Sequence, residues 1–379
     1  MINKDRLSET FKNLVEIDSV SREEGKFARE IKKILESMGA QTFVDNAGEK
    51  TGSDTGNLVA KFNGNVSALP LLINAHMDTV EPGKGIKAVL KNGVFTSDGS
   101  TILGADDKSS IAVILESLRV LQESELKYGP IDLVLTICEE IGLLGAKYFD
   151  SSLIDAKFGY ALDATDVNGI IVRAPAANRL EIKIHGKDSH AGAAPEKGIN
   201  AILLASKAIA GLEIGRIDRE TTCNIGIIEG GLATNIVPNL VTVKGEVRSH
   251  DMDKLAKVTD NIVSSFKDVV ESFRKIDSKD DLPSLEVFIE KDFSSTDIPE
   301  DHRIVTMAVQ AGKNLGRKIV CKTSGGGADS NIFFETGIMA GVLGTGIHGM
   351  HTVRENVKLE DMVKATELLI EIIKLHANS

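Results

Sequence analysis

The sequence predicts an α/β protein with a mostly parallel sheet and helices on both faces, interrupted by a smaller ferredoxin-like α+β domain. Near-continuous apolar stretches at 57–62, 70–75 and 131–138 alternate with helical patterns, as the strands of a buried parallel sheet do. From about residue 175 apolar and polar residues alternate instead, as in "RLEIKIHG", which indicates a sheet with one solvated face. The first pattern returns near residue 292, so the second domain is expected to be an insertion.

The first domain is expected to open with two helices and to close with one. Ser21 and Glu24 have the spacing of a capping box, which predicts the start of the second helix. The stretch "SSIAVILESLRVLQES" predicts a helix between the second and third strands. After the insertion the sequence indicates a helix at 301–315, strands in "KIVCK" and "GIMAGVL", and an amphipathic helix at 359–376.

The insertion has a β-α-β-β-α-β order, which is the ferredoxin-like arrangement. Its elements are "RLEIKIHG", a helix at 196–211, strands in "TTCNIGIIEGG" and "NLVTVKGEVRS", and a long helix over 253–277. We therefore assign residues 1–175 and 292–379 to one α/β domain and residues 176–291 to the inserted domain.

Length and composition exclude several classes of protein. A chain of 379 residues exceeds what one hydrophobic core usually supports, which agrees with two domains. With 44 Lys and Arg against 55 Asp and Glu, the net charge is −11, so we expect no nucleic-acid partner. No apolar run approaches the roughly 20 residues that span a bilayer. The N-terminus does not resemble a signal sequence, and the three cysteines form no C-x-x-C pair, so we expect a reducing, cytoplasmic location.

Acidic and histidine side chains follow several of the predicted strands. The carboxyl ends of parallel strands meet at one edge of a sheet, where working residues of open α/β folds lie. Histidine and carboxylates without cysteine are typical of a catalytic zinc or manganese site, and five such ligands suit two ions that share a bridging carboxylate. A further carboxylate then remains free as a general base. The candidates are His76, Asp78, Asp106, Asp107, Glu139, Glu140, Asp163, His348 and His351.

Each candidate also has an ordinary structural interpretation. His76 suits a hydrogen-bonded residue at a strand end, and Asp106 with Asp107 suits a helix N-cap. Glu139 and Glu140 would leave a strand in roughly opposite directions, as a solvated strand end does. What favours a metal site is the recurrence of ligand-type residues at the ends of several apolar strands.

The glycine-rich stretch "TSGGGADSN", residues 323–331, is a second kind of candidate site. Its backbone N–H groups could cradle an anion or a substrate carboxylate, with Gly326 as the substrate-binding position. The alternative is a tight strand-to-helix turn capped by Asp329, and both can hold together. "GTGIHG" matches the dinucleotide pattern G-x-G-x-x-G, but no helix opens directly after it.

Four motifs together resemble the zinc exopeptidase family that includes peptidase T, carboxypeptidase G, acetylornithine deacetylase and succinyl-diaminopimelate desuccinylase. They are "HMDTV", "GADDK", "EEIGLLGAK" and "HAGAAPEKGINAI", in the family's order and over nearly the whole chain. "GADDK" and "EEIGLLGAK" look closer to the peptidase T branch than to the deacylases.

The resemblance implies a role for each residue of the metal site. Two zinc ions would be bound, with Mn²⁺ or Co²⁺ as substitutes, and the Asp106–Asp107 peptide bond would be cis. Asp78 would accept a hydrogen bond from the far nitrogen of His76, and Glu139 would be the general base. His351 is preferred to His348 because "HTVRE" repeats the family's His-x-x-x-Glu spacing. The implied ligands are His76 and Asp163 for one zinc, Glu140 and His351 for the other, and Asp106 bridging the two.

The resemblance also implies that the inserted domain acts as a lid and a dimerisation domain. His190 would stabilise the oxyanion, often in the partner subunit's site, so we expect a homodimer through the insertion. Asn235 and Arg248 would hold the substrate's backbone and carboxylate, and a guanidinium suits the latter because it binds carboxylates bidentately.

The expected function is therefore metal-assisted hydrolysis of the N-terminal amide bond of a short peptide, as in a tripeptide aminopeptidase. An N-acyl amino acid deacylase or a dipeptidase with the same chemistry is the main alternative. A non-catalytic metal-binding relative is less favoured because Glu139 is retained beside Glu140. Peptide length, side-chain preference, the native metal and the oligomeric state stay open.

Overall fold

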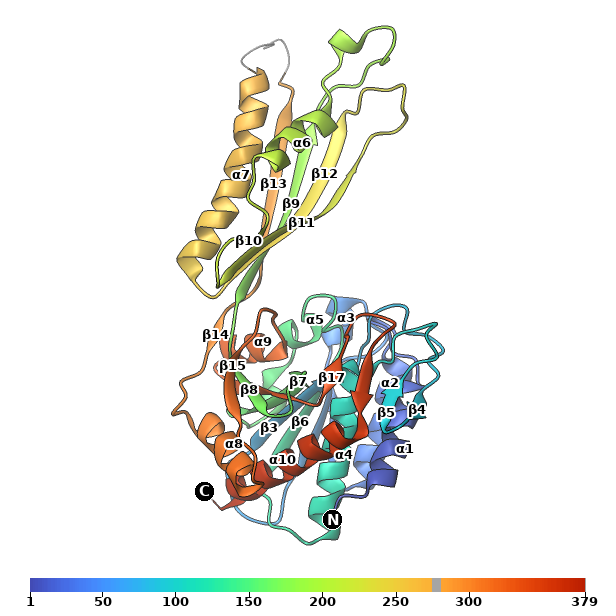
Figure 1. Ribbon diagram of the computed structural model, residues 1–379, viewed down its shortest axis with the longest axis vertical. Coiled ribbons are helices and arrows are strands. Elements are labelled where there is room, and N and C mark those ends of the chain that lie inside the picture. Colours follow the sequence, from blue (N-terminus) through green and yellow to red (C-terminus); the bar gives the residue numbers. More distant parts are fainter. Residues whose placement is uncertain (275–280, 379) are drawn as a thin grey trace. The chain divides into compact units, whose positions relative to one another are not determined.

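The computed structural model describes residues 1–274 and 281–378, and the chain divides into two compact units (Figure 1). Unit 1 comprises Met1–Arg173, Asp297–Ser324 and Ala328–Ser379, and unit 2 comprises Ala174–Thr296 and Gly325–Gly327. The boundary expected at residue 292 falls instead inside strand β13 (Ser284–Phe293). Among the helices of the described residues, none combines the length and apolarity needed to cross a membrane.

Unit 1 is built on a sheet of nine strands among the described residues. Its centre is parallel: β6 pairs with β3, β3 with β7, and β7 with β16. Antiparallel pairs flank this centre, with β1 on β2, β2 on β6, and β8 on β16. In spatial order the strands are β1 (Gln41–Val44), β2 (Leu58–Phe62), β6 (Ile131–Thr136), β3 (Leu71–His76), β7 (Phe158–Ala164), β16 (Met339–Gly344), β8 (Gly169–Ala174) and β14 (Thr296–Asp297), with β15 (Val320–Thr323) on β8.

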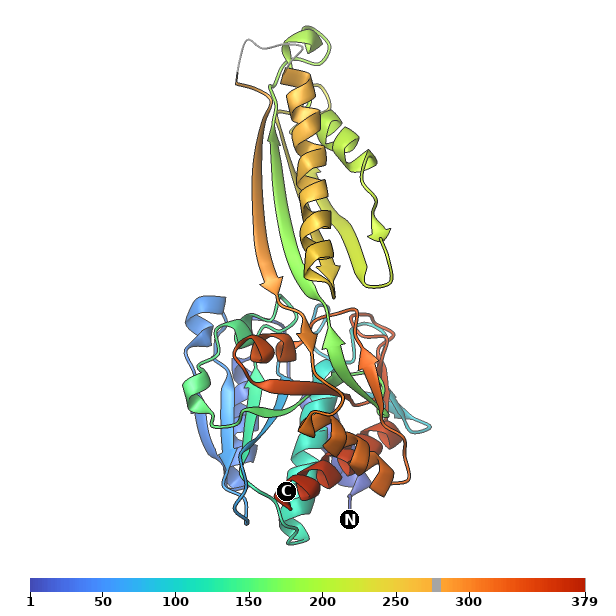
Figure 2. The ribbon, with the colours of Figure 1, turned by 90° about the vertical axis from the view of Figure 1, so that its left-hand side faces the viewer.

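Helices cover both faces of this sheet, as predicted (Figures 1 and 2). The larger core lies between one face and helices α1, α2, α4, α8 and α10, and a smaller core on the other face includes Phe333 of α9. The strands of the parallel centre are buried on both sides, which explains their near-continuous apolar sequences. The helices are α1 (Lys4–Val15), α2 (Gly25–Ser37), α3 (Ala47–Thr51), α4 (Ala105–Glu123), α5 (Leu144–Lys147), α8 (Arg303–Asn314), α9 (Asp329–Glu335) and α10 (Leu359–Ala377).

A second, small antiparallel sheet belongs to unit 1. In order, its strands are β17 (Ile347–His348), β18 (Asn356–Lys358), β5 (Val94–Thr96) and β4 (Val89–Lys91). The segment between β17 and β18 carries His351, so this sheet holds both ends of the loop that contains the histidine.

Unit 2 has the predicted β-α-β-β-α-β order, with one additional two-residue strand. The sheet order is β10-β11-β12-β9-β13, and every pair is antiparallel. Helices α6 and α7 lie on the same face, over a core of alternate residues such as Leu180, Ile182 and Ile184 (Figure 2). The elements are β9 (Ala176–His185), α6 (Ala201–Ala210), β10 (Gly215–Arg216), β11 (Thr221–Gly230), β12 (Leu240–Ser249), α7 (Met252–Arg274) and β13 (Ser284–Phe293).

Several predicted element bounds differ from the structure by a few residues. The strand predicted to reach residue 138 ends at Thr136, and the helix predicted from residue 196 begins at Ala201, where Asn200 caps it. The helix predicted over 253–277 ends at Arg274, and its last three predicted residues lie outside the described part of the chain. The α2 helix has Glu24 as its N-cap residue and begins at Gly25, so the predicted capping box from Ser21 does not form.

Candidate metal centre

The central strands bring the first two predicted ligands to the same edge of the sheet. His76, the last residue of β3, pairs with Thr136, the last residue of β6. On the other side of β3, Asn74 pairs with Ala161 in parallel. Two residues further along these strands, His76 and Asp163 are therefore level with each other, which is the arrangement expected where parallel strands end.

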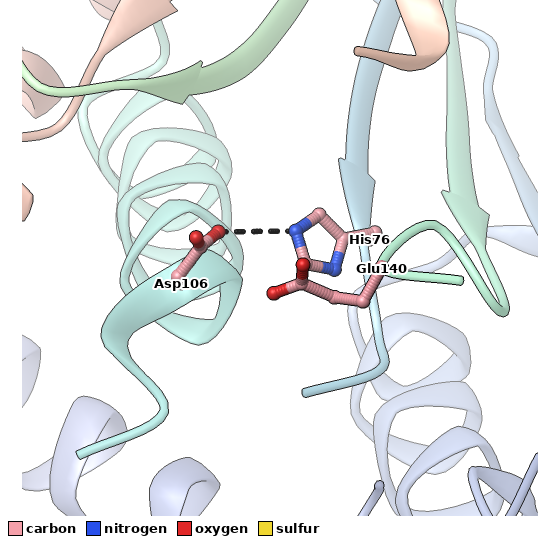
Figure 3. Close-up of side chains that lie close together, drawn as sticks. All are labelled: His76, Asp106 and Glu140. Atoms are coloured by element: carbon pink, nitrogen blue, oxygen red, sulfur yellow. Dashed lines mark hydrogen bonds and ion pairs between the residues drawn. The ribbon is translucent and has the colours of Figure 1, made fainter. Parts of the chain in front are cut away.

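Asp106 lies between two histidines. Its Oδ1 is 3.1 Å from His76 Nε2, and its Oδ2 is 3.5 Å from His351 Nε2 (Figure 3 draws the first contact). His351 Nε2 is also 2.8 Å from Oε2 of Glu140. The two oxygens of one carboxylate thus face two different imidazoles, as a bridging ligand requires.

Potential donor atoms gather in two groups that share Asp106. One group is His76, Asp106 and Glu140, drawn in Figure 3, and the other is Asp106, Asp107 and Asp163. In each group the donor atoms lie within 4.8 Å of one another. The Asp106–Asp107 peptide bond is cis, which confirms the expectation. Asp107 was a candidate of the site but not one of the ligands that the resemblance implies; its Oδ2 accepts a hydrogen bond from the backbone N–H of His76 at 3.1 Å.

His351, rather than His348, contacts the acidic cluster. His348 is exposed and pairs with Asn356 within the small sheet. His351 follows in the loop and adopts a left-handed backbone conformation with φ 61°, uncommon for a non-glycine residue. The His-x-x-x-Glu spacing therefore selected the histidine that reaches Glu140.

Asp78 contacts both the imidazole of His76 and the backbone of the glutamate pair. His76 Nδ1 lies 3.0 Å from the backbone carbonyl oxygen of Asp78 and 3.4 Å from its carboxylate Oδ1. The carboxylate itself accepts hydrogen bonds from the backbone N–H groups of Glu139 at 2.9 Å and Glu140 at 3.2 Å, and from Ser21 Oγ at 2.6 Å. Asp78 thus orients the imidazole mainly through its main chain and holds the glutamate pair through its side chain.

The glutamate pair lies in a turn, and the expectation that it continues the strand was wrong. The chain leaves β6 after Thr136, and Cys138 has a φ of 52°, so side chains no longer alternate across a sheet. Glu139 is buried, with 9% of its surface exposed, and the side chain of Glu140 is 5% exposed. Two adjacent carboxylates are therefore held away from water beside the histidines.

The electrostatics of the cluster favour bound cations. Burial raises the pKa of Glu139, Glu140 and Asp163, and repulsion among the carboxylates raises it further. Hydrogen bonds to Asp106 and Glu140 raise the pKa of His351 to about 10. Burial opposes ionisation of His76, but Asp106 and Asp78 raise its pKa well above its usual value. A buried cluster with this excess of acid is stabilised where positive charge is supplied.

Glu140 gives a direct test of whether the residues fit metal ions. Its Oε1 is buried and has no hydrogen-bond partner among the described residues, whereas Oε2 faces His351. A buried carboxylate oxygen without a partner is costly unless a cation or donor meets it. The imidazole and carboxylate donor set is that of catalytic zinc sites. The residues therefore fit a metal centre.

Glu355 contacts the segment that carries Asp106, and no role was predicted for it from the sequence. It is 1% exposed, and its carboxylate accepts backbone hydrogen bonds from Leu103, Gly104 and Asp106 at 2.9, 2.7 and 2.8 Å. Burial raises its pKa to about 7. Glu355 thus joins the His351 loop to the segment that presents Asp106. The sequence feature that could have pointed to Glu355 is the His-x-x-x-Glu spacing of "HTVRE", in which it is the glutamate.

Asp329 was interpreted as a possible helix cap, and the structure places it elsewhere. The N-cap residue of α9 is Ala328, and Asp329 is the first helical residue. Its buried carboxylate accepts hydrogen bonds from Thr136 Oγ1 and, at 3.4 Å, from Asn74 Nδ2. Burial raises its pKa to about 6, and it contributes to the raised pKa of Glu139 and Asp163. It is a further acidic neighbour of the metal centre.

The predicted residues of unit 2 form two groups. His190 and Asn235 are neighbours, since His190 forms a β-bridge with Ile236 and Ala191 N–H donates to Asn235 O at 2.9 Å. Arg248 of β12 pairs with Ala177 near the start of β9, whereas Leu240 pairs with His185 at its end, just before His190.

Gly326 lies near Arg248, at the start of β9, and these two residues form the second group. Its neighbour Gly327 packs so closely on the ring of Phe293 that an added Cβ would lie 2.5 Å from it. Phe293 pairs with Ala177, the strand partner of Arg248. Since β9 has ten residues at about 3.3 Å each, roughly 30 Å separates the two ends of this strand.

An α/β fold with an inserted α+β unit, and a histidine–carboxylate cluster at the carboxyl edge of its sheet, defines a metal-dependent hydrolase. The chain belongs to the peptidase family M20/M25/M40, whose model matches residues 72–375, and it is a metallopeptidase. It is 38% identical to the uncharacterized protein YqjE of Bacillus subtilis (strain 168) over 375 residues, covering 99% of both chains.

Two solved structures are similar over the full length of the chain. One is a tripeptidase from Staphylococcus aureus subsp. aureus Mu50, with 36% identity, a TM-score of 0.92 and 100% of both chains covered. The other is the aminopeptidase PepT from Bacillus cereus ATCC 10987, with 36% identity, a TM-score of 0.87 and the same coverage. These findings confirm the predicted resemblance to peptidase T-like enzymes.

Proposed function

We propose that this protein is a di-zinc aminopeptidase that hydrolyses the N-terminal amide bond of short peptides, with tripeptides as the favoured substrates. The observation that carries the proposal is Asp106, whose two carboxylate oxygens face His76 at 3.1 Å and His351 at 3.5 Å. The likeness to a tripeptidase and to an aminopeptidase supports the choice of substrate. The cytoplasmic location stays a prediction.

The chain's own residues divide the metal-binding role. His76 and Asp163 would hold one ion, Glu140 and His351 the other, and Asp106 would bridge them. When bound, two divalent cations polarise the scissile carbonyl and lower the pKa of water. Imidazole and carboxylate donors suit zinc, and Mn²⁺ or Co²⁺ are the alternatives.

Glu139 is proposed as the general base. Asp78 fixes its backbone, and burial raises its pKa, so its carboxylate is a stronger base than an exposed glutamate. Glu139 takes a proton from the attacking water and returns it to the leaving amine. Its neighbour Glu140 differs in role because its Oε2 is engaged by His351.

His190 is proposed as the donor to the oxyanion of the tetrahedral intermediate. Its Nδ1 accepts hydrogen bonds from the backbone N–H groups of Gly192 at 3.2 Å and Ala193 at 3.1 Å. An Nδ1 that accepts leaves the proton on Nε2, which can then donate to developing negative charge. Arg248, Asn235 and Gly326 are proposed to hold the substrate.

A homodimer through the inserted domain is part of this proposal. A tripeptide extends over only about 10 Å, whereas the group of His190 and Asn235 lies roughly 30 Å along β9 from the group of Arg248 and Gly326. One copy therefore does not place both groups on one short peptide. We propose that His190 and Asn235 act on the substrate bound by a second copy.

The test uses Glu139→Ala and the wild-type chain, each loaded with zinc, manganese or cobalt. The substrates are Ala-Ala-Ala, Ala-Ala and N-acetyl amino acids. We expect the wild type to prefer the tripeptide, and Glu139→Ala to keep about two metals per chain while losing at least about 100-fold in kcat. Preference for a dipeptide or an N-acetyl amino acid would establish the alternative function. Full turnover by Glu139→Ala would refute the mechanism, and metal binding without any hydrolysis by the wild type would refute the catalytic function.

A further inference from the structure

The turn that carries the glutamate pair is held by an unusual set of hydrogen bonds. Beyond β6, four consecutive backbone N–H groups donate to side-chain oxygens from three distant segments. Buried backbone donors need such acceptors where strand pairing ends. The donors and acceptors are Ile137 with Asn57 Oδ1 (3.0 Å), Cys138 with Glu24 Oε1 (2.9 Å), Glu139 with Asp78 Oδ1 (2.9 Å) and Glu140 with Asp78 Oδ2 (3.2 Å).

Glu24 is the acceptor at the residue where the chain changes direction. Its Oε1 accepts from both the N–H and, at 3.3 Å, the Sγ of Cys138, and its Oε2 accepts from Ser53 Oγ. Cys138 is fully buried and has a φ of 52°, a left-handed conformation that a residue with a Cβ adopts only when its surroundings favour it. Glu24 thus meets Cys138, whose backbone is left-handed, directly before the glutamate pair.

Glu24 itself is fully buried, with none of its surface exposed. It is therefore out of reach of a substrate and cannot act on it directly. The residue lies in the first compact unit together with the metal centre. Any effect of Glu24 on catalysis must pass through the turn.

We propose that Glu24 is a positioning residue, which acts through the backbone of Cys138 to place Glu139 and Glu140. The inference rests on the proposed function, because it assigns Glu24 to the same metal centre. A displacement of about 1 Å at reacting groups can cost on the order of 100-fold in rate. Loss of the acceptor at Cys138 therefore lowers kcat without removing any group that touches the substrate.

Two substitutions separate the acceptor from the charge. Glu24→Ala leaves the Cys138 N–H buried without its acceptor, and we expect kcat to fall by about 10- to 100-fold while KM changes by less than about threefold. Glu24→Gln keeps the shape, since its carbonyl oxygen can accept from Cys138 and its NH₂ can donate to Ser53. We expect Glu24→Gln to restore kcat to within about threefold of the wild type.

A third substitution is the matched control. Glu116 is also a fully buried glutamate, but it binds Arg6 and the backbone of Asn3 rather than the turn. Glu116→Ala therefore lowers stability and leaves kcat and KM unchanged. Hydrogen exchange of a peptide that covers residues 137–140 gives a readout independent of activity: exchange becomes at least about tenfold faster in Glu24→Ala only.

Every outcome decides the proposal. A folded Glu24→Ala with wild-type kcat and exchange overturns it, as does a Glu24→Gln that loses as much kcat as Glu24→Ala. An equal loss in Glu116→Ala overturns it too, because the effect is then general destabilisation. If Glu24→Ala does not fold, Glu24→Asp replaces it, with an expected partial loss of kcat; failure of both to fold assigns Glu24 to folding instead. Wild-type protein without peptide hydrolysis would refute the proposed function, and the exchange result then still decides the role of Glu24 in the turn.

Discussion

Replacing Glu355 by Gln perturbs the link between the His351 loop and Asp106. The wild-type carboxylate is 1% exposed and accepts from three backbone N–H groups, with Oε2 serving Leu103 and Gly104 and Oε1 serving Asp106. A glutamine has one accepting oxygen and one donating NH₂. If its oxygen keeps the pair at Leu103 and Gly104, its NH₂ faces the N–H of Asp106, and one hydrogen bond becomes a contact between two donors.

The magnitude follows from that single lost acceptor. A buried N–H left without a partner costs about 1–3 kcal/mol. The two remaining bonds also weaken, because hydrogen bonds to a charged acceptor are stronger than those to a neutral one. Removing a buried charge offsets part of this loss, since burial already raises the pKa of Glu355 to about 7. We expect the free energy of unfolding of the first unit to fall by about 1–3 kcal/mol.

The assay is urea unfolding followed by far-UV circular dichroism. The urea concentration at the midpoint is compared between variants, because a chain with two compact units need not unfold in a single two-state transition. With a slope of about 2–3 kcal/mol per M of urea, the midpoint is expected to fall by about 0.3–1.5 M. Glu360→Gln is the matched control: Glu360 is exposed and pairs with Lys4 at the surface, so its shift is expected to be close to zero. A Glu355→Gln midpoint indistinguishable from that of Glu360→Gln would show that the three backbone contacts do not stabilise the unit.

Two further predictions concern histidines. His376 is buried with Nε2 2.7 Å from Leu69 O, and burial lowers its pKa from the usual 6.5. The unfolded chain therefore binds the proton more tightly, so the free energy of unfolding decreases as pH falls below about 6.5, by at most about 1.4 kcal/mol per pH unit. In His376→Gln the pH dependence of thermal unfolding is expected to be weaker than in the wild type. An identical pH dependence in the two proteins would contradict this prediction. His351→Ala is expected to lower the metal content by about one ion per chain and to abolish most activity, because His351 contacts Glu140. His348→Ala, whose histidine pairs with Asn356 instead, is expected to keep its metal content and its activity within about twofold of the wild type, as measured by elemental analysis and kinetics. Equal losses in the two variants would contradict the choice of His351 as the ligand.

The metal centre could be predicted in outline because its residues follow apolar strands. Parallel strands share their carboxyl edge, so His76 and Asp163 belong together once their strands are neighbours. Asp106 is expected at the same edge, because it lies in the first turn of α4, the helix that precedes β6, and such a helix begins at the edge where parallel strands end. Periodicity alone does not show that one carboxylate has its two oxygens on different imidazoles, since that depends on the loop that delivers His351.

By itself, the sequence determined the fold class, the inserted unit and the residues that gather at the sheet edge. The reason is that hydrophobic periodicity and the order of helices and strands along the chain can both be read from local stretches of sequence. Only the tertiary structure decided what Ser21 and Glu24 do. Their spacing matches a capping box, yet Ser21 donates to Asp78 and Glu24 accepts from Cys138, 114 residues away. The physical reason is that a buried hydroxyl or carboxylate bonds to whichever donors and acceptors the fold brings near it, and no local spacing specifies a partner at that distance along the chain.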